Sequence, residues 1–223
     1  MKVKELFEVE KMSDEKFLIM EKIYKWRQKL KAKNSDTIFG KFKVIPYNGG
    51  YAVEHLSKKL VIHEWMFENG ELPFKFASCE KLEVVGGNAM RTFKNFPDKI
   101  INSNDDSYPG AFSMGDSIFT AAVNLTSLEG CPSYINGAVT FAYCRNLSFS
   151  NADKHIKFAK KIILPFAYKG PILSLLRIEG LESTGITQDL QFKILNKHLQ
   201  GDRDILDCQE ELIDAGFKEY AKL

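Results

Sequence analysis

The sequence GAVTFAYCRNL at residues 137–147 aligns without a gap on GDSIFTAAVNL at residues 115–125, an offset of 22 residues. Glycine, phenylalanine, asparagine and leucine recur at matching positions. A second pair accompanies the first, because LTSLEGCPSYI at residues 125–135 repeats the spacing of MRTFKNFPDKI at residues 90–100. Both fit apolar-x-Ser/Thr-apolar-x-x-x-Pro-x-x-Ile. Two motifs that recur in the same order indicate an internal repeat.

A period near 22 residues is typical of leucine-rich and related β-solenoid coils. Each coil would place its phenylalanine and leucine inward, and an asparagine before the turn would satisfy backbone groups of the neighbouring coil. Residues 76–82 resemble an earlier rung of the same kind. We therefore predict an α+β chain built around a short leucine-rich-repeat-like β-solenoid.

The repeat is interrupted by extra chain. Ile135 and Phe141 are six positions apart, whereas Ile100 and Phe119 are 19 apart, which leaves 13 additional residues around 102–114. This polar, turn-rich insertion contains Asp105, Asp106 and Tyr108. Such insertions project as loops and often bind partners, although a tolerated decoration fits equally well. Two adjacent carboxylates without a third ligand do not make a metal site, and we predict none.

The N-terminal region begins with a helix. Ser13 is a favourable cap for a helix that runs to about Lys33, with acidic residues near its positive end. Phe17, Met20, Tyr24 and Trp26 lie along one side of it, and Ile23 and Leu30 widen that side. The basic run at 25–33 is either a solvated helix face or a surface that follows phosphates, with Trp26 stacking on a base.

Strands and turns follow the helix. Residues 39–45, 51–53 and 60–67 read as strands, and Asn48-Gly49-Gly50 is a strong turn signal between the first two. Helices are predicted at 187–199 and 204–214 and would cover the open end of the solenoid. We divide the chain into an N-terminal helix and hairpin region (1–70), degenerate solenoid repeats (71–165) and a C-terminal helical cap (166–223).

The composition is that of a globular protein, and its charge is unevenly distributed. The 223 residues are 44% apolar and 27% charged, with a net charge of +2. This balance argues against a whole-chain nucleic-acid binder. Residues 1–33 nevertheless carry ten basic and six acidic side chains, whereas residues 201–223 carry three basic and seven acidic ones. A basic N-terminus and an acidic C-terminus therefore cancel.

Cysteines and hydropathy indicate the compartment. Cys79, Cys131, Cys144 and Cys208 form no CxxC pair, so we interpret them as small buried apolar residues in a reducing environment. The charged start lacks a signal-peptide core, and the apolar runs are too short to span a bilayer. We expect a cytoplasmic protein with no membrane partner.

No catalytic motif is present. The sequence lacks GxSxG, a P-loop, HExxH and a glycine-rich dinucleotide turn, and His55 and His63 do not have a metal-ligand spacing. We predict no enzymatic activity, no cofactor and no metal. Sequence motifs do not reveal catalytic sites that are assembled from distant residues.

Residues 76–223 resemble a family from tailed bacteriophages, chiefly large myoviruses and marine phages. Its members carry tandem repeats like LTSLEGCP at 125–132 and rungs like FAYCRNL at 141–147. They end in a module like GPILSLLRIEGL at 170–181, which continues through ILNKHL at 194–199 and DILDCQEELIDAG at 204–216. This chain departs from the family in its few degenerate repeats and its own N-terminal region.

The resemblance implies a phage protein that acts in the infected host cytoplasm, without a catalytic residue to carry over. Small phage accessory proteins often antagonise host defence, so we expect a non-enzymatic factor that binds a host protein, for example a nucleic-acid-modifying toxin such as a DNA ADP-ribosyltransferase. The alternative is a nucleic-acid-binding accessory factor of phage metabolism. Aromatic and arginine side chains dominate interfaces, and the partner-binding candidates are Trp26, Arg27, Asp105, Asp106, Tyr108, Tyr134, Tyr143 and Arg145.

Overall fold

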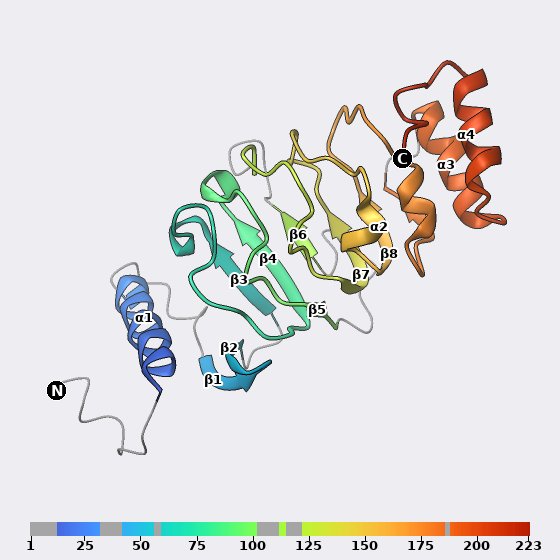
Figure 1. Ribbon diagram of the computed structural model, residues 1–223. Helices are drawn as coiled ribbons and strands as arrows, with labels where there is room; N and C mark the ends of the chain where they lie inside the picture. The colour runs from blue at the N-terminus through green and yellow to red at the C-terminus, as the bar shows by residue number, and fades with distance from the viewer. Residues whose placement is uncertain (1–12, 32–41, 56–58, 102–111, 115–121, 186–187) are drawn as a thin grey trace.

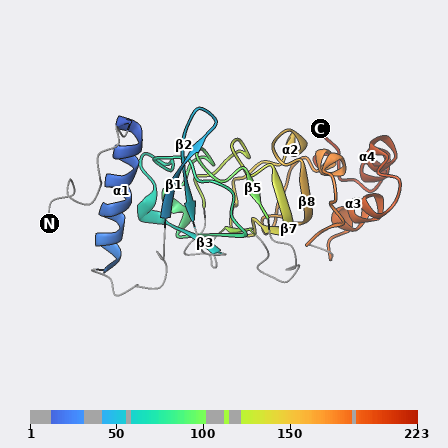
Figure 2. The same cartoon turned by 90° about the horizontal axis from the view of Figure 1, so that it is seen from below.

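A layer of parallel strands lies between helices at the two ends of the chain (Figure 1). The computed structural model describes residues 13–31, 42–55, 59–101, 112–114, 122–185 and 188–223. Helix α1 and the hairpin β1–β2 lie at one end of the sheet, and helices α3 and α4 lie at the other (Figure 2). The basic helix α1 and the acidic helix α4 therefore lie at opposite ends of the described structure.

The N-terminal helix α1 spans Asp14–Lys31. The backbone N–H of Lys16 donates to Ser13 Oγ at 3.3 Å, which confirms the predicted cap. Ile19, Ile23 and Trp26 are buried, and their spacing of four and three residues places them on one face. Ile23 and Trp26 are confirmed on the buried face, whereas Phe17 and Tyr24, also predicted there, are exposed.

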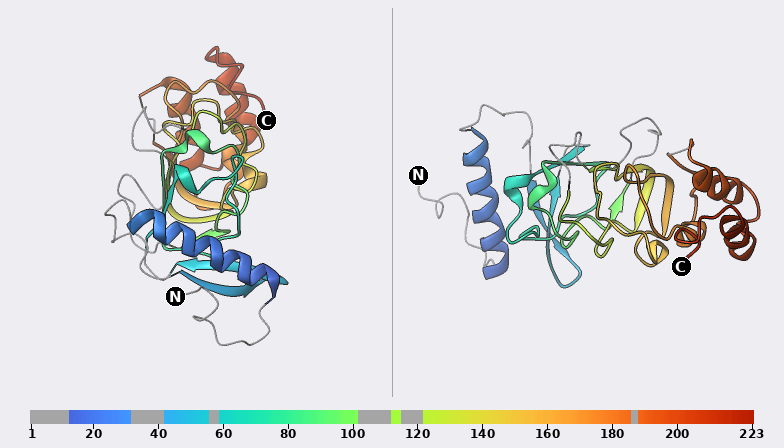
Figure 3. Two further views of the ribbon diagram at one scale, coloured as in Figure 1. Left: turned by 90° about the vertical axis from the view of Figure 1, so that its left-hand side faces the viewer. Right: turned by 90° about the horizontal axis from the view of Figure 1, so that it is seen from above.

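Strands β1 (Phe42–Tyr47) and β2 (Gly50–His55) form an antiparallel hairpin beside α1 (Figure 3). Asn48 and Gly49 occupy the turn at φ +48° and +83°. Asparagine followed by glycine favours this left-handed pair of conformations, so the predicted turn is confirmed. The predicted strand at 60–67 ends earlier, because Glu64–Met66 form the 3₁₀ helix η2.

The main sheet has seven strands, and its strand pairs are parallel. The strand order is β3-β4-β6-β7-β8-β9, with β5 paired to β7. The strands are β3 (Lys59–His63), β4 (Lys81–Val85), β5 (Lys99–Ile100), β6 (Phe112–Met114), β7 (Tyr134–Thr140), β8 (Phe158–Ile163) and β9 (Ser183–Thr184).

The predicted leucine-rich-repeat-like β-solenoid is therefore wrong. The chain is α+β with a mostly parallel seven-stranded sheet and a few helices. Neighbouring parallel strands need a connection of at least about a dozen residues. One strand and its connection can therefore produce a period of this length without a solenoid. The repeated asparagines support this role in connections, because Asn124 and Asn146 each donate a 2.7 Å hydrogen bond to a neighbouring connection, at Asn88 O and Val123 O.

The structure also corrects the C-terminal boundary of the insertion predicted at 102–114. Phe112, Ser113 and Met114 are buried and form β6, which lies between β4 and β7 inside the sheet. A strand of three residues is too short to show an alternating hydrophobic pattern. The sequence therefore did not distinguish it from the turn-rich residues before it. Asp105, Asp106 and Tyr108 lie outside the described residues.

The C-terminal helices are confirmed. Helix α3 spans Leu190–Gln200 and α4 spans Ile205–Asp214, where Asp204 accepts bonds of 2.7 and 3.1 Å from the N–H groups of Leu206 and Asp207. Asn196 Oδ1 accepts from the backbone N–H of Thr184 at 2.7 Å, which joins α3 to β9. The short helix α2 (Ala152–His155) and the 3₁₀ helices η3 (Gly87–Ala89) and η4 (Leu173–Arg177) complete the fold.

Buried side chains form one cluster that extends from Ile19 on α1 to Ala221 near the C-terminus. All four cysteines belong to it and none forms a disulfide, as their sequence context predicts. Burial raises the pKa of the Cys79, Cys144 and Cys208 thiols to about 12, and that of Cys131 also rises. The thiols therefore stay protonated and serve as apolar packing groups.

Candidate functional site

Trp26 and Arg27 are neighbours in sequence and point to different environments. Trp26 is 5% exposed, and its ring packs 4.9 Å from Phe74 and 5.9 Å from Trp65. Trp26 packs α1 against the rest of the molecule. Its ring is therefore buried and is not available for the surface contact that the sequence predicted. Arg27 is exposed.

Tyr134 and Tyr143 lie at opposite ends of the β7 region. Tyr134 begins β7, is 36% exposed and stacks on Phe158 of β8 with ring centroids 4.7 Å apart. Tyr143 follows the carboxyl end of β7. The two tyrosines therefore cannot contribute to one small contact area, because the length of the strand separates them.

Tyr143 and Arg145 belong to a group of side chains at the carboxyl ends of the strands. Phe166, which follows β8, is 58% exposed, and its ring lies 5.3 Å from that of Tyr143 in an edge-on arrangement. Val123, exposed on the adjacent connection, completes the group. We call Val123, Tyr143, Arg145 and Phe166 the aromatic patch.

Backbone bonds hold the aromatic patch in place. The N–H of Phe166 donates to Ala142 O at 3.0 Å, next to Tyr143. Asn146 Nδ2 donates to Val123 O at 2.7 Å, next to Arg145. Each connection is thus bonded to its neighbour, and the patch is presented on preformed turns, which lowers the cost of ordering it on association.

Sequence reasoning singles out Tyr143 and Arg145 but misses Phe166 and Val123. The apolar run at 162–167 reads as a buried strand, so Phe166 is not distinguished from its buried neighbours. One signal could have found it: Phe166 follows Pro165, and proline terminates a strand and exposes what comes after it.

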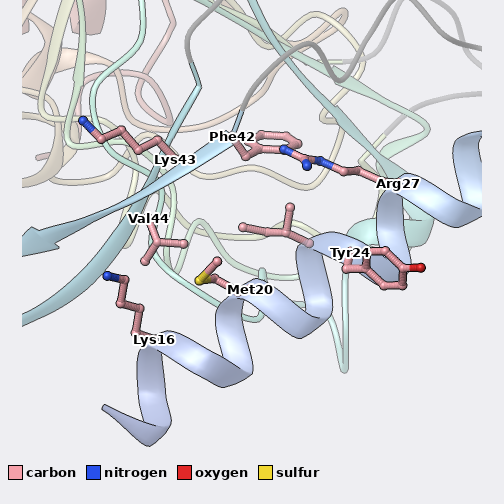
Figure 4. Close-up of a pocket in the computed structure, with 8 residues that line it drawn as sticks. Lys16, Met20, Tyr24, Arg27, Phe42, Lys43 and Val44 are labelled. Atoms are coloured by element: carbon pink, nitrogen blue, oxygen red, sulfur yellow. The ribbon is translucent and has the colours of Figure 1, made fainter. Parts of the chain in front are cut away.

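A second surface feature is a basic groove between α1 and β1 (Figure 4). Its volume is about 460 Å³. The lining combines three cations, two aromatic rings and three aliphatic or thioether side chains. These residues are Lys16, Met20, Ile23, Tyr24, Arg27, Phe42, Lys43 and Val44.

The cations of α1 differ in whether the chain itself neutralises them. Lys22 pairs with Glu68 at 2.5 Å and Lys25 with Glu21 at 2.8 Å. The Lys29 ammonium lies 5.4 Å from the centre of the Trp65 ring.

The cations of the groove are not neutralised in this way, since Lys16, Arg27 and Lys43 form no ion pair within the part of the chain that the structure describes. The groove lining therefore includes two α1 cations, Lys16 and Arg27, that no described carboxylate neutralises.

Outside the cysteines, the largest pKa shifts occur in a hydrogen-bonded group of side chains whose role is structural. Tyr47 Oη donates to Asp98 Oδ2, and Lys75 Nζ donates to Asp98 Oδ1 at 2.5 Å and to Phe96 O at 2.6 Å. Burial opposes ionisation of Asp98, but the bonds from Lys75 and Tyr47 outweigh it and lower the Asp98 pKa. The Asp98 bond raises the pKa of Tyr47 to about 12. The group fastens the hairpin to the segment before β5.

We expect Asp98→Asn to lower the free energy of unfolding by about 1 kcal/mol at pH 7, because it weakens two hydrogen bonds at a partly exposed site. The folded-state pKa of Asp98 is depressed, so the carboxylate stabilises the fold above its unfolded pKa. That contribution is lost as the pH falls through the folded-state pKa. Urea denaturation between pH 3 and pH 7 would show a gap between wild type and variant that narrows toward acid. A gap that is constant with pH would contradict the assignment, and Asp207→Asn, on an exposed helix face, serves as the control.

The described residues contain no arrangement that binds a metal, since no group of three His, Cys, Asp or Glu side chains within them is placed to hold an ion. None of the described helices is long and apolar enough to cross a membrane. Comparison with known proteins finds no match to a family model, a curated protein or a solved structure.

Proposed function

We propose that this chain is a non-enzymatic interaction protein of a tailed phage that binds and neutralises a host macromolecule. We place the target among host defence factors or toxins, for example a nucleic-acid-modifying toxin such as a DNA ADP-ribosyltransferase. The phage origin rests on the sequence resemblance, and the binding role rests on the aromatic patch.

The composition of the aromatic patch supports a protein target. Tyrosine and arginine are enriched among the residues that carry most of the energy of protein interfaces, and aromatic side chains supply large contact areas. Phe166 exposes most of its ring without a partner in the chain beyond Tyr143 and the backbone bond at Ala142, among the described residues. Apolar area that remains exposed on fixed turns favours an interaction surface.

The nucleic-acid alternative has weaker support. The predicted stacking residue, Trp26, is buried, and Lys25 and Lys29 are engaged by Glu21 and Trp65. The aromatic patch contributes a single cation, Arg145, whereas single-strand binding surfaces combine stacking rings with several cations.

Capture from infected host cells tests the proposal. Tagged wild-type chain is expected to retain one host protein in a 1:1 ratio, which is then purified and titrated by calorimetry. The double variant Tyr143→Ala/Phe166→Ala should weaken that complex at least about tenfold, because hot-spot truncations cost more than about 1 kcal/mol each. Charge reversal at Arg145 (Arg145→Glu) should weaken it further.

Leu190→Ala is the matched control, since Leu190 is an exposed apolar residue on α3 and does not belong to the aromatic patch. It should bind like wild type, and the purified complex should abolish the activity of the target when that target is a toxin. Equal binding by wild type and the Tyr143/Phe166 variant would refute the role of the patch. Capture of no host protein by either end-tagged form would refute the proposed function.

A further inference from the structure

The basic groove is complementary in charge to an acidic surface on helix α4 of the same chain. Helix α4 carries four carboxylates, of which three lie in its last seven residues and the fourth is Asp207, and it has no basic residue in its last turn. Glu211 is paired with Lys197 at 2.7 Å and with His198 at 2.9 Å. The other three acids, Asp207, Glu210 and Asp214, are exposed and have no ion-pair partner among the described residues.

Position on the helix makes these acids unfavourable in an isolated chain. The carboxyl end of a helix carries partial negative charge, so among these acids it is Asp214, in the last turn, that raises the free energy there, next to the nearby Glu211. A cationic surface placed against α4 would relieve this repulsion.

Exposed apolar side chains accompany the acids. Leu206 is 72% exposed and Ile213 is 42% exposed. Leu206, Glu210 and Asp214 are spaced by four residues, and Leu206 and Ile213 by seven, so all four lie on one face of the helix. The outer face of α4 is therefore a stripe of leucine and isoleucine bordered by acids.

The groove has the matching pattern. Met20 and Val44 form an apolar floor, Lys16 and Arg27 lie beside it on α1, and Lys43 extends from the β1 edge away from Met20 (Figure 4). From Lys16 to Arg27 the helix rises about 16 Å, and the ten residues of α4 are about 15 Å long. The groove and the helix thus agree in charge, in apolar content and in length.

One chain cannot bring the two surfaces together, because α1 and α4 lie at opposite ends of the molecule in each view (Figures 1–3). We infer that α4 of one copy binds in the basic groove of a second copy, so that the chain associates head to tail. The two surfaces differ, so the contact leaves one groove and one α4 unoccupied in a dimer, and further copies add until a ring closes or a filament grows.

Two variants test the two surfaces of this contact separately. The groove variant is Arg27→Gln/Lys43→Gln, and the helix variant is Asp207→Asn/Glu210→Gln/Asp214→Asn. All five changes are at exposed residues and remove charge, and the three carboxylate changes do so at nearly constant size. Circular dichroism and thermal unfolding verify that both variants fold.

Sedimentation velocity and light scattering measure the assembly. At about 20 mM salt and about 100 μM chain, wild type is expected to reach at least twice the monomer mass, and about 500 mM salt should return it to monomer because exposed charges are screened. Each variant alone should stay monomeric. Their equimolar mixture should form a dimer that does not grow, since the helix of the groove variant can still enter the groove of the helix variant.

The control is Lys169→Gln/Lys193→Gln, which removes two exposed lysines outside the groove and should associate like wild type. A wild-type chain that stays monomeric at low salt would overturn the inference, as would a mixture that remains monomeric or single variants that still associate. Binding of a single-stranded oligonucleotide by monomeric wild type, lost in the groove variant, would assign the groove to nucleic acid and overturn it as well.

Discussion

Phe141→Ala is expected to lower the free energy of unfolding by about 3–5 kcal/mol, the cost of deleting a buried aromatic ring and leaving a cavity. Phe141 is completely buried at the end of β7. Its ring lies 5.6 Å from Phe149, 5.8 Å from Phe112 and 6.3 Å from Phe93. These three aromatic neighbours come from three different segments, so no single local shift can refill the space.

Urea denaturation at pH 7 measures this loss as a lower midpoint. Phe166→Ala is the matched control, because it removes the same side chain from an exposed position and should cost less than about 1 kcal/mol. A Phe141→Ala variant as stable as Phe166→Ala would contradict the position of Phe141 in the core.

Gly180→Ala is expected to cost about 2–3 kcal/mol, the sum of a left-handed backbone penalty of about 1–2 kcal/mol and a steric clash. Gly180 has φ +70°, a conformation that residues with a Cβ disfavour. A Cβ at this position would lie 2.5 Å from the ring of Phe158. Accommodating it must displace the Phe158 ring, which stacks on Tyr134 at 4.7 Å.

Gly216→Ala isolates the clash from the backbone penalty. Gly216 has φ +87°, and an added Cβ there would meet nothing within 4 Å. The measured difference between the two alanine variants in urea denaturation is therefore the cost of moving Phe158. Equal losses in both variants would show that Phe158 does not press on Gly180.

Much of the local structure is predictable because its causes are local. Ser13 and Asp204 cap helices through bonds to N–H groups two to three residues ahead, at 3.3 and 2.7–3.1 Å. The Asn48-Gly49 turn depends on the backbone preferences of those two residues. Sequence inspection detects both kinds of signal.

The order of the strands is not a local property. The repeated asparagines correctly mark equivalent positions in connections, as the bonds of Asn124 and Asn146 show. It does not report that the connections belong to a seven-stranded sheet or that the segment at 112–114 is one of its strands. A parallel pair joins residues about 20 or more positions apart, as Leu82 and Phe112 illustrate, so periodicity alone does not identify the architecture.

The candidate surfaces show the same division. The aromatic and arginine content identifies Tyr143 and Arg145 as contact residues, and the uneven charge marks a basic start and an acidic end. Packing then decides which of these side chains reach the surface. It buries Trp26 against Phe74, exposes Phe166 beside Tyr143 and leaves Lys16, Arg27 and Lys43 as the unpaired cations of the groove.

The sequence by itself determined the caps, the hairpin turn, the C-terminal helices and the burial of all four cysteines, because these depend on a few neighbouring residues or on residue type. Only the tertiary structure decided the strand order, the face by which α1 packs and the pairing of its lysines. Those features arise from contacts such as Lys22 with Glu68, 46 residues apart, and such contacts exist only once the chain has folded.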